Sequence, residues 1–168
     1  RMDKEALVQI IQRAIQAERD GNRFYSRAAG ATRDPKAKNM FEQLARDELY
    51  HVEVIEDLYR DLLTGGTIEP VKGYPIFEER EKESGEEIPN FGSEAEVLEQ
   101  AIRDEIASRD FYRETAASLG LEQGQEVFHD LVEMEEGHIR LLQAELDFLE
   151  KTGFYFDHME FSVEGERD

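Results

Sequence analysis

Apolar side chains recur at alternating spacings of three and four residues along four long stretches of the chain. This period places them on one face of an α-helix, as in helices that pack together in a bundle. The pattern predicts four helices, at residues 3–32, 35–63, 94–119 and 122–151. We therefore expect an all-α fold, a four-helix bundle in a single domain that covers residues 1–168.

Local signals support these helix ends. Asp34 and Pro35 can end the first helix and start the second, because Asp caps a helix N-terminus and Pro is favoured in its first turn. Ser93, with Glu96 three residues later, forms the pattern of a capping box for the third helix. Gly120 then closes that helix. The predicted segments thus begin and end at residues whose chemistry suits a terminus.

The second and third predicted helices are joined by a long connection, residues 64–92, which contains three of the four prolines and a run of charged residues. A short turn would bring the third helix back antiparallel to the second. A connection of this length can instead cross the whole bundle. We expect a long crossover that lies along the bundle surface.

The segment after the fourth predicted helix, residues 152–168, is rich in aromatic side chains. It is too short to fold alone, so we expect it to dock on the bundle or on a partner subunit. Phe154, Tyr155, Phe156 and Phe161 offer more apolar surface than a free tail normally exposes. The sequence therefore suggests a homodimer or a larger homo-oligomer.

Residues 41–51 and 128–138 both place Phe, Leu, Glu and His at relative positions 1, 4, 8 and 11, with an offset of 87 residues. The same offset relates Glu18 to Glu105, Phe24 to Phe111 and Tyr25 to Tyr112. The chain is therefore an internal duplication. The repeated polar residues on the inner helix faces are Glu18, Glu48, His51, Glu105, Glu135 and His138.

Charge and composition narrow the class of partner. The chain has 40 acidic and 20 basic residues, a formal net charge of −20. Such a surface repels phosphate backbones and anionic membranes, so we expect neither nucleic acid nor membrane as a partner. An acidic surface is also an ordinary solubilising feature. No apolar run approaches the 18 or so residues of a membrane span, and we expect a cytoplasmic protein.

The inward glutamates require a positive partner. A buried, unpaired carboxylate costs on the order of several kcal/mol, and four together would also repel one another. The neighbouring positions on the same helix faces contain no Lys or Arg. Cysteine is absent, which leaves only oxygen and imidazole nitrogen as metal ligands. Glu-x-x-His presents both groups to one point on a helix, so two divalent ions would neutralise the cluster.

These motifs resemble the rubrerythrin branch of the ferritin-like superfamily, from Glu5 to Lys151. The resemblance rests on Glu18 with Phe24-Tyr25, Glu48-Leu-Tyr-His51, Glu105 with Phe111-Tyr112, and Glu135-Glu-Gly-His138. It implies a ferritin-like bundle in which Glu48 and Glu135 bridge two irons and are the catalytic residues. By the same resemblance Glu18 and Glu105 each cap one iron, while His51 and His138 each ligate one.

Two departures from the family pattern are visible. Rubrerythrins proper carry a rubredoxin domain whose iron is held by cysteines, and this chain has no cysteine. A separate protein would have to donate electrons. The family also carries another Glu about one turn along the third helix, where this chain has Ser108 and Arg109. The chain is closer to a rubredoxin-less relative.

We therefore expect a dinuclear carboxylate protein, with two Fe ions, that reduces peroxide or dioxygen using an external electron donor. A ferroxidase or iron-handling protein is one alternative, and a metal-binding or interaction module without turnover is another. The same ligands also suit Mn or Zn.

Other residues contribute less to this hypothesis. Tyr25 and Tyr112 could donate hydrogen bonds to metal-bound carboxylates, but plain core aromatics are an equal alternative. Glu136 lies only two residues from His138 and should point elsewhere on its helix. His129 and His158 fall outside the repeat and are expected to be bystanders.

Overall fold

The computed structural model describes residues 4–66, 92–120 and 122–156. Its elements are α1 (Lys4–Ala31), α2 (Pro35–Thr64), α3 (Glu94–Ser118) and α4 (Glu122–Thr152). No strand occurs within the described ranges. The all-α prediction is confirmed, and each described helix end lies within one residue of the predicted one.

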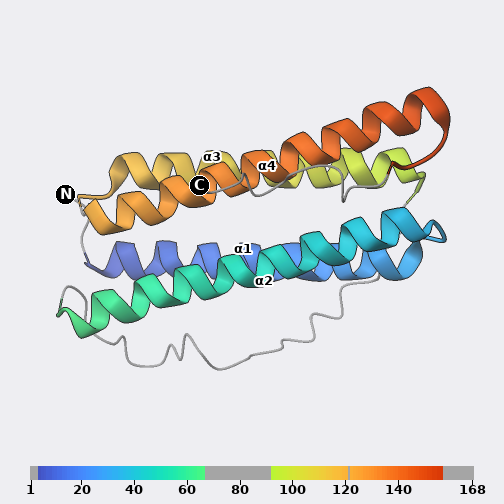
Figure 1. Cartoon of the computed structure of the whole chain (residues 1–168). Helices are drawn as coiled ribbons and strands as arrows, with labels where there is room; N and C mark the ends of the chain where they lie inside the picture. The colour runs from blue at the N-terminus through green and yellow to red at the C-terminus, as the bar shows by residue number, and fades with distance from the viewer. Residues whose placement is uncertain (1–3, 67–91, 121, 157–168) are drawn as a thin grey trace, which may run out of the picture.

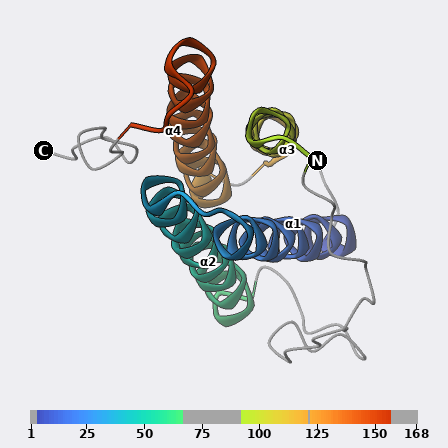
Figure 2. The ribbon, with the colours of Figure 1, turned by 90° about the vertical axis from the view of Figure 1, so that its right-hand side faces the viewer.

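The four helices form two hairpins that stack on each other (Figure 1). Helix α1 packs mainly against α2, and α3 against α4. An end-on view shows α2 beside α4 and α1 beside α3 (Figure 2). The end of α2 and the start of α3 lie at opposite ends of the bundle. The predicted crossover at 64–92 falls largely on residues 67–91, outside the described part, so its course stays a prediction.

Both predicted N-terminal caps are present. The Asp34 side chain accepts hydrogen bonds from the backbone N–H groups of Lys36 and Ala37, with Pro35 in the first turn of α2. Ser93 and Glu96 form the reciprocal bonds of a capping box at the start of α3. These bonds satisfy backbone donors that have no partner inside the helix.

The core consists of two apolar clusters with a layer of buried polar residues between them. One cluster includes Ile11, Ile55, Leu58, Tyr112, Phe128 and Leu131. The other includes Tyr25, Phe41, Leu44, Leu98, Leu141 and Leu142. In sequence, Glu18, Glu48, Glu105 and Glu135 each lie between the contributions that their helix makes to the two clusters. The polar layer therefore has apolar packing on both sides along the bundle.

The first residues after α4 pack on the same chain. Tyr155 is buried in the second apolar cluster, and the Phe156 backbone N–H donates to Glu145 Oε2 at 3.2 Å. Phe154 is 69% exposed. The expected docking on the bundle is thus seen for two aromatic residues. Phe161 lies outside the described residues, and assembly with a second subunit stays a prediction.

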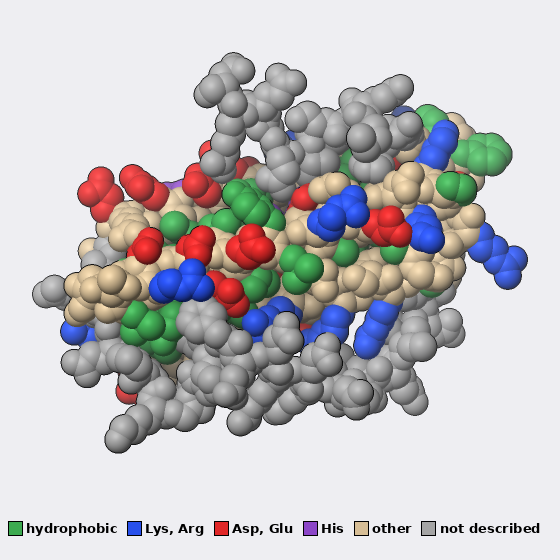
Figure 3. Space-filling model, turned by 60° about the horizontal axis from the view of Figure 1, so that its bottom comes forward, with side chains coloured by type: hydrophobic (Ala, Val, Ile, Leu, Met, Phe, Trp, Pro, Cys, Tyr) green, Lys and Arg blue, Asp and Glu red, His purple; other side chains and the backbone are tan. Residues whose placement is uncertain are grey.

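The described surface carries charges of both signs. Figure 3 shows acidic and basic side chains interspersed on the face that lies at the bottom of Figure 1. On that face the net charge of −20 does not produce a surface of one sign. None of the described helices combines the length and the apolar character that crossing a bilayer requires.

Candidate metal centre

The six repeated polar residues meet in the layer between the two apolar clusters. One glutamate comes from each helix, and the two histidines come from α2 and α4. Each residue is at most 3% exposed. The residues are Glu18, Glu48, His51, Glu105, Glu135 and His138. The periodicity and the repeat thus identified side chains that the fold brings together.

The cluster divides into two groups that could each hold a metal ion. One is Glu18, Glu48, His51 and Glu135, and the other is Glu48, Glu105, Glu135 and His138. Within each group, one ligand atom per residue lies within 4.8 Å of the others. The groups share Glu48 and Glu135. If each group held one ion, these two glutamates would be available as ligands to both ions.

The histidines face this shared centre with equivalent atoms. His51 Nδ1 lies 3.2 Å from Glu18 Oε2 and 3.0 Å from Glu135 Oε1. His138 Nδ1 lies 3.2 Å from Glu105 Oε1 and 3.7 Å from Glu48 Oε1. The two imidazole rings stack with centroids 5.4 Å apart. The two halves of the chain therefore supply ligands in nearly the same geometry.

Two buried tyrosines contact the cluster, and each reaches the glutamate of the other half. The Tyr25 O–H on α1 donates to Glu105 Oε1 on α3 at 2.5 Å. The Tyr112 O–H on α3 donates to Glu18 Oε1 on α1. Burial and the negative charge of the accepting glutamate raise the pKa of both phenols, so they remain donors. These bonds orient the terminal carboxylates.

Protons are distributed unevenly over the four glutamates. Burial, together with repulsion from neighbouring glutamates, raises the pKa of Glu48 and Glu135 well above the usual range. Burial also raises the pKa of Glu18 and Glu105. For these two glutamates, hydrogen bonds and the charge of the nearby histidine outweigh burial, so the pKa of each is lowered. The metal-free cluster therefore keeps protons on the two shared glutamates, and a divalent ion would displace them.

A family model described as Rubrerythrin matches residues 9–146. The chain belongs to the rubrerythrin family. The match covers most of the sequence and confirms the family resemblance and the ferritin-like class. No curated protein and no solved structure matched the chain significantly. Family membership supports the interpretation of the cluster as a metal centre.

The donor set of this rubrerythrin-family chain fits a pair of divalent ions. It consists of carboxylate oxygen and imidazole nitrogen, which suit iron, manganese and zinc. Among the described residues, Lys and Arg form ion pairs with other acidic residues and not with Glu18, Glu48, Glu105 or Glu135. In the part of the chain that the structure describes, the basic side chains paired with these glutamates are His51 and His138. Two bound cations would neutralise the negative charge of the glutamates directly.

Sequence reasoning missed Asp47, which lies directly behind one ligand. Asp47 is 9% exposed, and its Oδ2 lies 3.1 Å from His138 Nε2. Its Oδ1 accepts a hydrogen bond from Gln43 Nε2 at 2.8 Å. The 87-residue offset pairs Asp47 with Met134, so a search for repeated residues passes over it. Buried Glu145 was missed for the same reason, since its counterpart is Leu58.

Glu136 and His129, which the sequence analysis did not count as ligands, lie outside the buried cluster. Glu136 binds Arg113 at 2.7 Å, with a side chain that is 37% exposed. His129 is exposed. His158 lies outside the described residues. Ser108, which stands where the family pattern has another Glu, is partly buried and lines a pocket.

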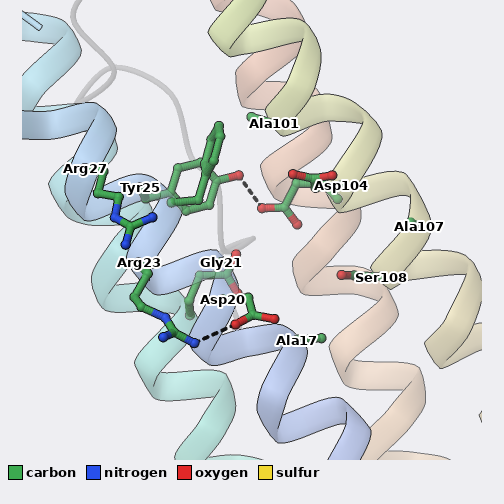
Figure 4. A pocket seen from close by; sticks show the side chains of 13 residues that line it. Ala17, Asp20, Gly21, Arg23, Tyr25, Arg27, Ala101, Asp104, Ala107 and Ser108 are labelled. Carbon is green, nitrogen blue, oxygen red and sulfur yellow. Dashed lines mark hydrogen bonds and ion pairs between the residues drawn. The ribbon is translucent and has the colours of Figure 1, made fainter. Parts of the chain in front are cut away.

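That pocket opens between α1 and α3 and reaches the metal centre (Figure 4). Its volume is about 410 Å³, and Glu48 and Glu105 form part of its wall. Figure 4 shows Arg23 and Arg27 on the α1 side and Ser108 on the α3 side. The pocket provides a route by which a small molecule could reach Glu48, one of the two shared carboxylates.

We expect the metal-free protein to lose stability as pH rises from about 7 to about 10. Burial lowers the pKa of His138, but the charge of Glu105 and hydrogen bonds to Asp47 and Glu105 raise it to about 10, against an ordinary value of 6.5. Between these values the folded chain holds a proton that the unfolded chain has released. The stabilisation is complete below pH 6.5 and is lost as pH rises through about 10.

Thermal melts in excess chelator across this pH range measure the effect. The His138→Gln variant, which has no titrating ring, is the control and should lose much of the pH dependence. A wild-type melting temperature that rises with pH, or an equal slope in the variant, would contradict this assignment.

Proposed function

We propose that the chain is a dinuclear oxidoreductase that binds two iron ions and reduces peroxide or dioxygen, with electrons from a separate donor protein. The observation that supports this most directly is the pair of four-residue groups that share Glu48 and Glu135. A single ion would leave one histidine and one terminal glutamate without a role. Family membership supports iron as the metal.

When bound, a ferrous pair supplies the two electrons that cleavage of an O–O bond requires. The protein contributes the geometry and the surroundings. Glu48 and Glu135 hold both positions together, while Tyr25 and Tyr112 orient the terminal glutamates. The apolar clusters on either side exclude bulk water and strengthen these contacts. No side chain is needed as a nucleophile.

Substrate reaches the centre through the pocket between α1 and α3 in this proposal. At Gly21 an added Cβ would lie 3.2 Å from Glu48 Cδ and 3.3 Å from its Oε1, closer than ordinary van der Waals contact. The absence of a side chain lets α1 approach the shared carboxylate. Gly21 thus lines the pocket next to Glu48.

Gly21→Ala should lower peroxide turnover about tenfold, because Glu48 must shift by a few tenths of an ångström and misplacement of about 1 Å can cost 10²-fold. Steady-state rates of the iron-loaded variants measure this. Gly30→Ala is the matched control, since a Cβ at Gly30 on the same helix meets nothing within 4 Å. Equal rates for the two variants would refute the role given to Gly21.

The test of the function is anaerobic loading with Fe(II), followed by separate mixing with peroxide and with dioxygen while the diferric absorption is followed. Two irons per chain, rapid oxidation by peroxide, and re-reduction by an electron donor would support the proposal. Oxidation of many irons per chain by dioxygen, with retention of the product, would identify an iron-handling protein instead. Two bound ions without reaction would identify a metal-binding module.

A further inference from the structure

The pocket between α1 and α3 is much larger than hydrogen peroxide or dioxygen requires. Its volume is about 410 Å³. A water molecule accounts for about 30 Å³ of the liquid, so a molecule with two oxygen atoms fills about twice that volume. Pockets of about 300–1,000 Å³ are typical of sites that bind organic molecules. The space beside Glu48 therefore has room for a substrate that carries an organic group together with a peroxide group.

Small residues from both helices keep this space open. Ala17 and Gly21 lie on the α1 side, and Ala101 and Ala107 lie on the α3 side (Figure 4). Phe24 also lines the pocket. None of these five residues has a polar side-chain atom, so together they form an apolar wall. An alkyl or aryl group is stabilised when it leaves water for such a wall.

The charged groups in the outer part of the pocket balance one another. Asp20 and Asp104 are exposed, and Arg23 and Arg27 are partly buried. Arg23 Nη2 lies 2.7 Å from Asp20 Oδ1, and Gln100 Nε2 donates to Asp104 Oδ1 at 2.9 Å. A cleft lined by charges of one sign concentrates ions of the opposite sign, but this outer lining has two charges of each sign. It therefore gives a charged substrate no advantage over a neutral one.

The inner end of the pocket is polar and belongs to the buried cluster. Glu48 and Glu105 form part of its wall, and each is only 3% exposed. Tyr25 also lines this end, and its hydroxyl donates to Glu105 Oε1. The pocket thus combines an apolar wall with a carboxylate end. A molecule with an organic group at one end and a peroxide group at the other matches both surfaces.

We propose that the substrate is a neutral organic hydroperoxide, which the protein reduces to the corresponding alcohol. The peroxide group points to Glu48, and the alkyl or aryl group lies against the apolar wall. Reduction breaks the O–O bond, takes two electrons from the ferrous pair and two protons from the solvent, and yields the alcohol and one water molecule. The separate donor protein then returns the two electrons. This inference rests on the proposed dinuclear function and specifies its substrate class.

The variant Ala107→Leu tests the apolar wall, because Ala107 is exposed on α3 and a larger side chain there takes the space of the organic group. Ala117→Leu is the matched control, since Ala117 is an exposed alanine of the same helix that does not line the pocket. Ferrous-loaded protein is mixed anaerobically with cumene hydroperoxide or with hydrogen peroxide, and the diferric absorption gives a second-order rate constant for each.

In the wild-type protein, cumene hydroperoxide should oxidise the ferrous pair at least as fast as hydrogen peroxide does. The ratio of the two rate constants should fall about tenfold or more in Ala107→Leu, because a misfit of one methylene group in an apolar pocket costs about 10- to 200-fold. Ala117→Leu should keep the wild-type ratio. The ratio separates loss of the organic group's site from a general slowing of entry into the pocket.

Binding can be measured without turnover in the Zn(II)-loaded protein. The probe is 2-phenyl-2-propanol, the alcohol formed from cumene hydroperoxide. In NMR spectra its aromatic protons should show nuclear Overhauser effects to the methyl groups of Ala101 and Ala107. Ala107→Leu should weaken this binding about tenfold or more, and Ala117→Leu should preserve it.

An unchanged rate ratio in Ala107→Leu, an equal fall in Ala117→Leu, or an alcohol that does not contact the apolar wall would overturn the proposal. Rapid oxidation by hydrogen peroxide with none by cumene hydroperoxide would overturn the organic substrate and leave the dinuclear function standing. If neither peroxide oxidised a bound ferrous pair, the substrate class and the proposed function would fail together.

Discussion

Alanine at Glu48 or at Glu135 should abolish binding of the metal pair, whereas alanine at Glu136 should leave it nearly intact. Glu48 and Glu135 belong to both four-residue groups, so removal of either takes a ligand from both positions. Glu136 follows Glu135 directly but forms an ion pair with Arg113 on the surface. The contrast between adjacent residues on one helix separates a loss of ligation from a general loss of acidic charge.

The measurement is the metal content of each variant after anaerobic loading and removal of free Fe(II). Wild type and Glu136→Ala should retain two ions per chain, and the other two variants none or a weakly held fraction. Far-UV circular dichroism confirms that the helices remain. Two tightly held ions in Glu48→Ala or Glu135→Ala would show that the shared carboxylates do not bridge, and the dinuclear model would have to be abandoned.

Leucine at Glu48 should make the metal-free protein more stable while destroying metal binding. The pKa of Glu48 is raised by burial and by repulsion from Glu18, Glu105 and Glu135, so it is in an unfavourable environment without metal. Replacement of buried charged groups by apolar side chains of similar volume is often neutral or stabilising by about 1–4 kcal/mol. A stabilising loss of Glu48 would indicate that this residue is retained for function, at a cost to the stability of the metal-free protein.

Thermal melts in excess chelator compare wild type, Glu48→Leu and Glu136→Leu. We expect a melting temperature several degrees higher for Glu48→Leu only, because the Glu136 side chain is 37% exposed, pairs with Arg113 and lies outside the buried cluster. Metal should then raise the melting temperature of wild type and not that of Glu48→Leu. A clearly less stable Glu48→Leu protein would mean that Glu48 serves the fold through a partner within the protein.

Much of this architecture was determined by sequence alone. Helix positions follow from local periodicity and capping residues, which is why the predicted ends agree with α1 to α4 to within one residue. The buried polar cluster follows from the 87-residue repeat, because a polar residue on an otherwise apolar face must lie in the core when that face is buried. Both arguments use only the geometry of a single helix and the desolvation of charge.

Contacts between helices were decided by the tertiary structure. The sequence suggested that Tyr25 could donate a hydrogen bond to a carboxylate, and packing directs its hydroxyl to Glu105 in the other half. Asp47 had no repeated counterpart, and its contact with His138 depends on how α2 lies against α4. The close approach of Gly21 to Glu48 likewise requires the two helices to be in place. Periodicity specifies which face of a helix is buried, whereas the distance and rotation between helices are set by how all the side chains pack together.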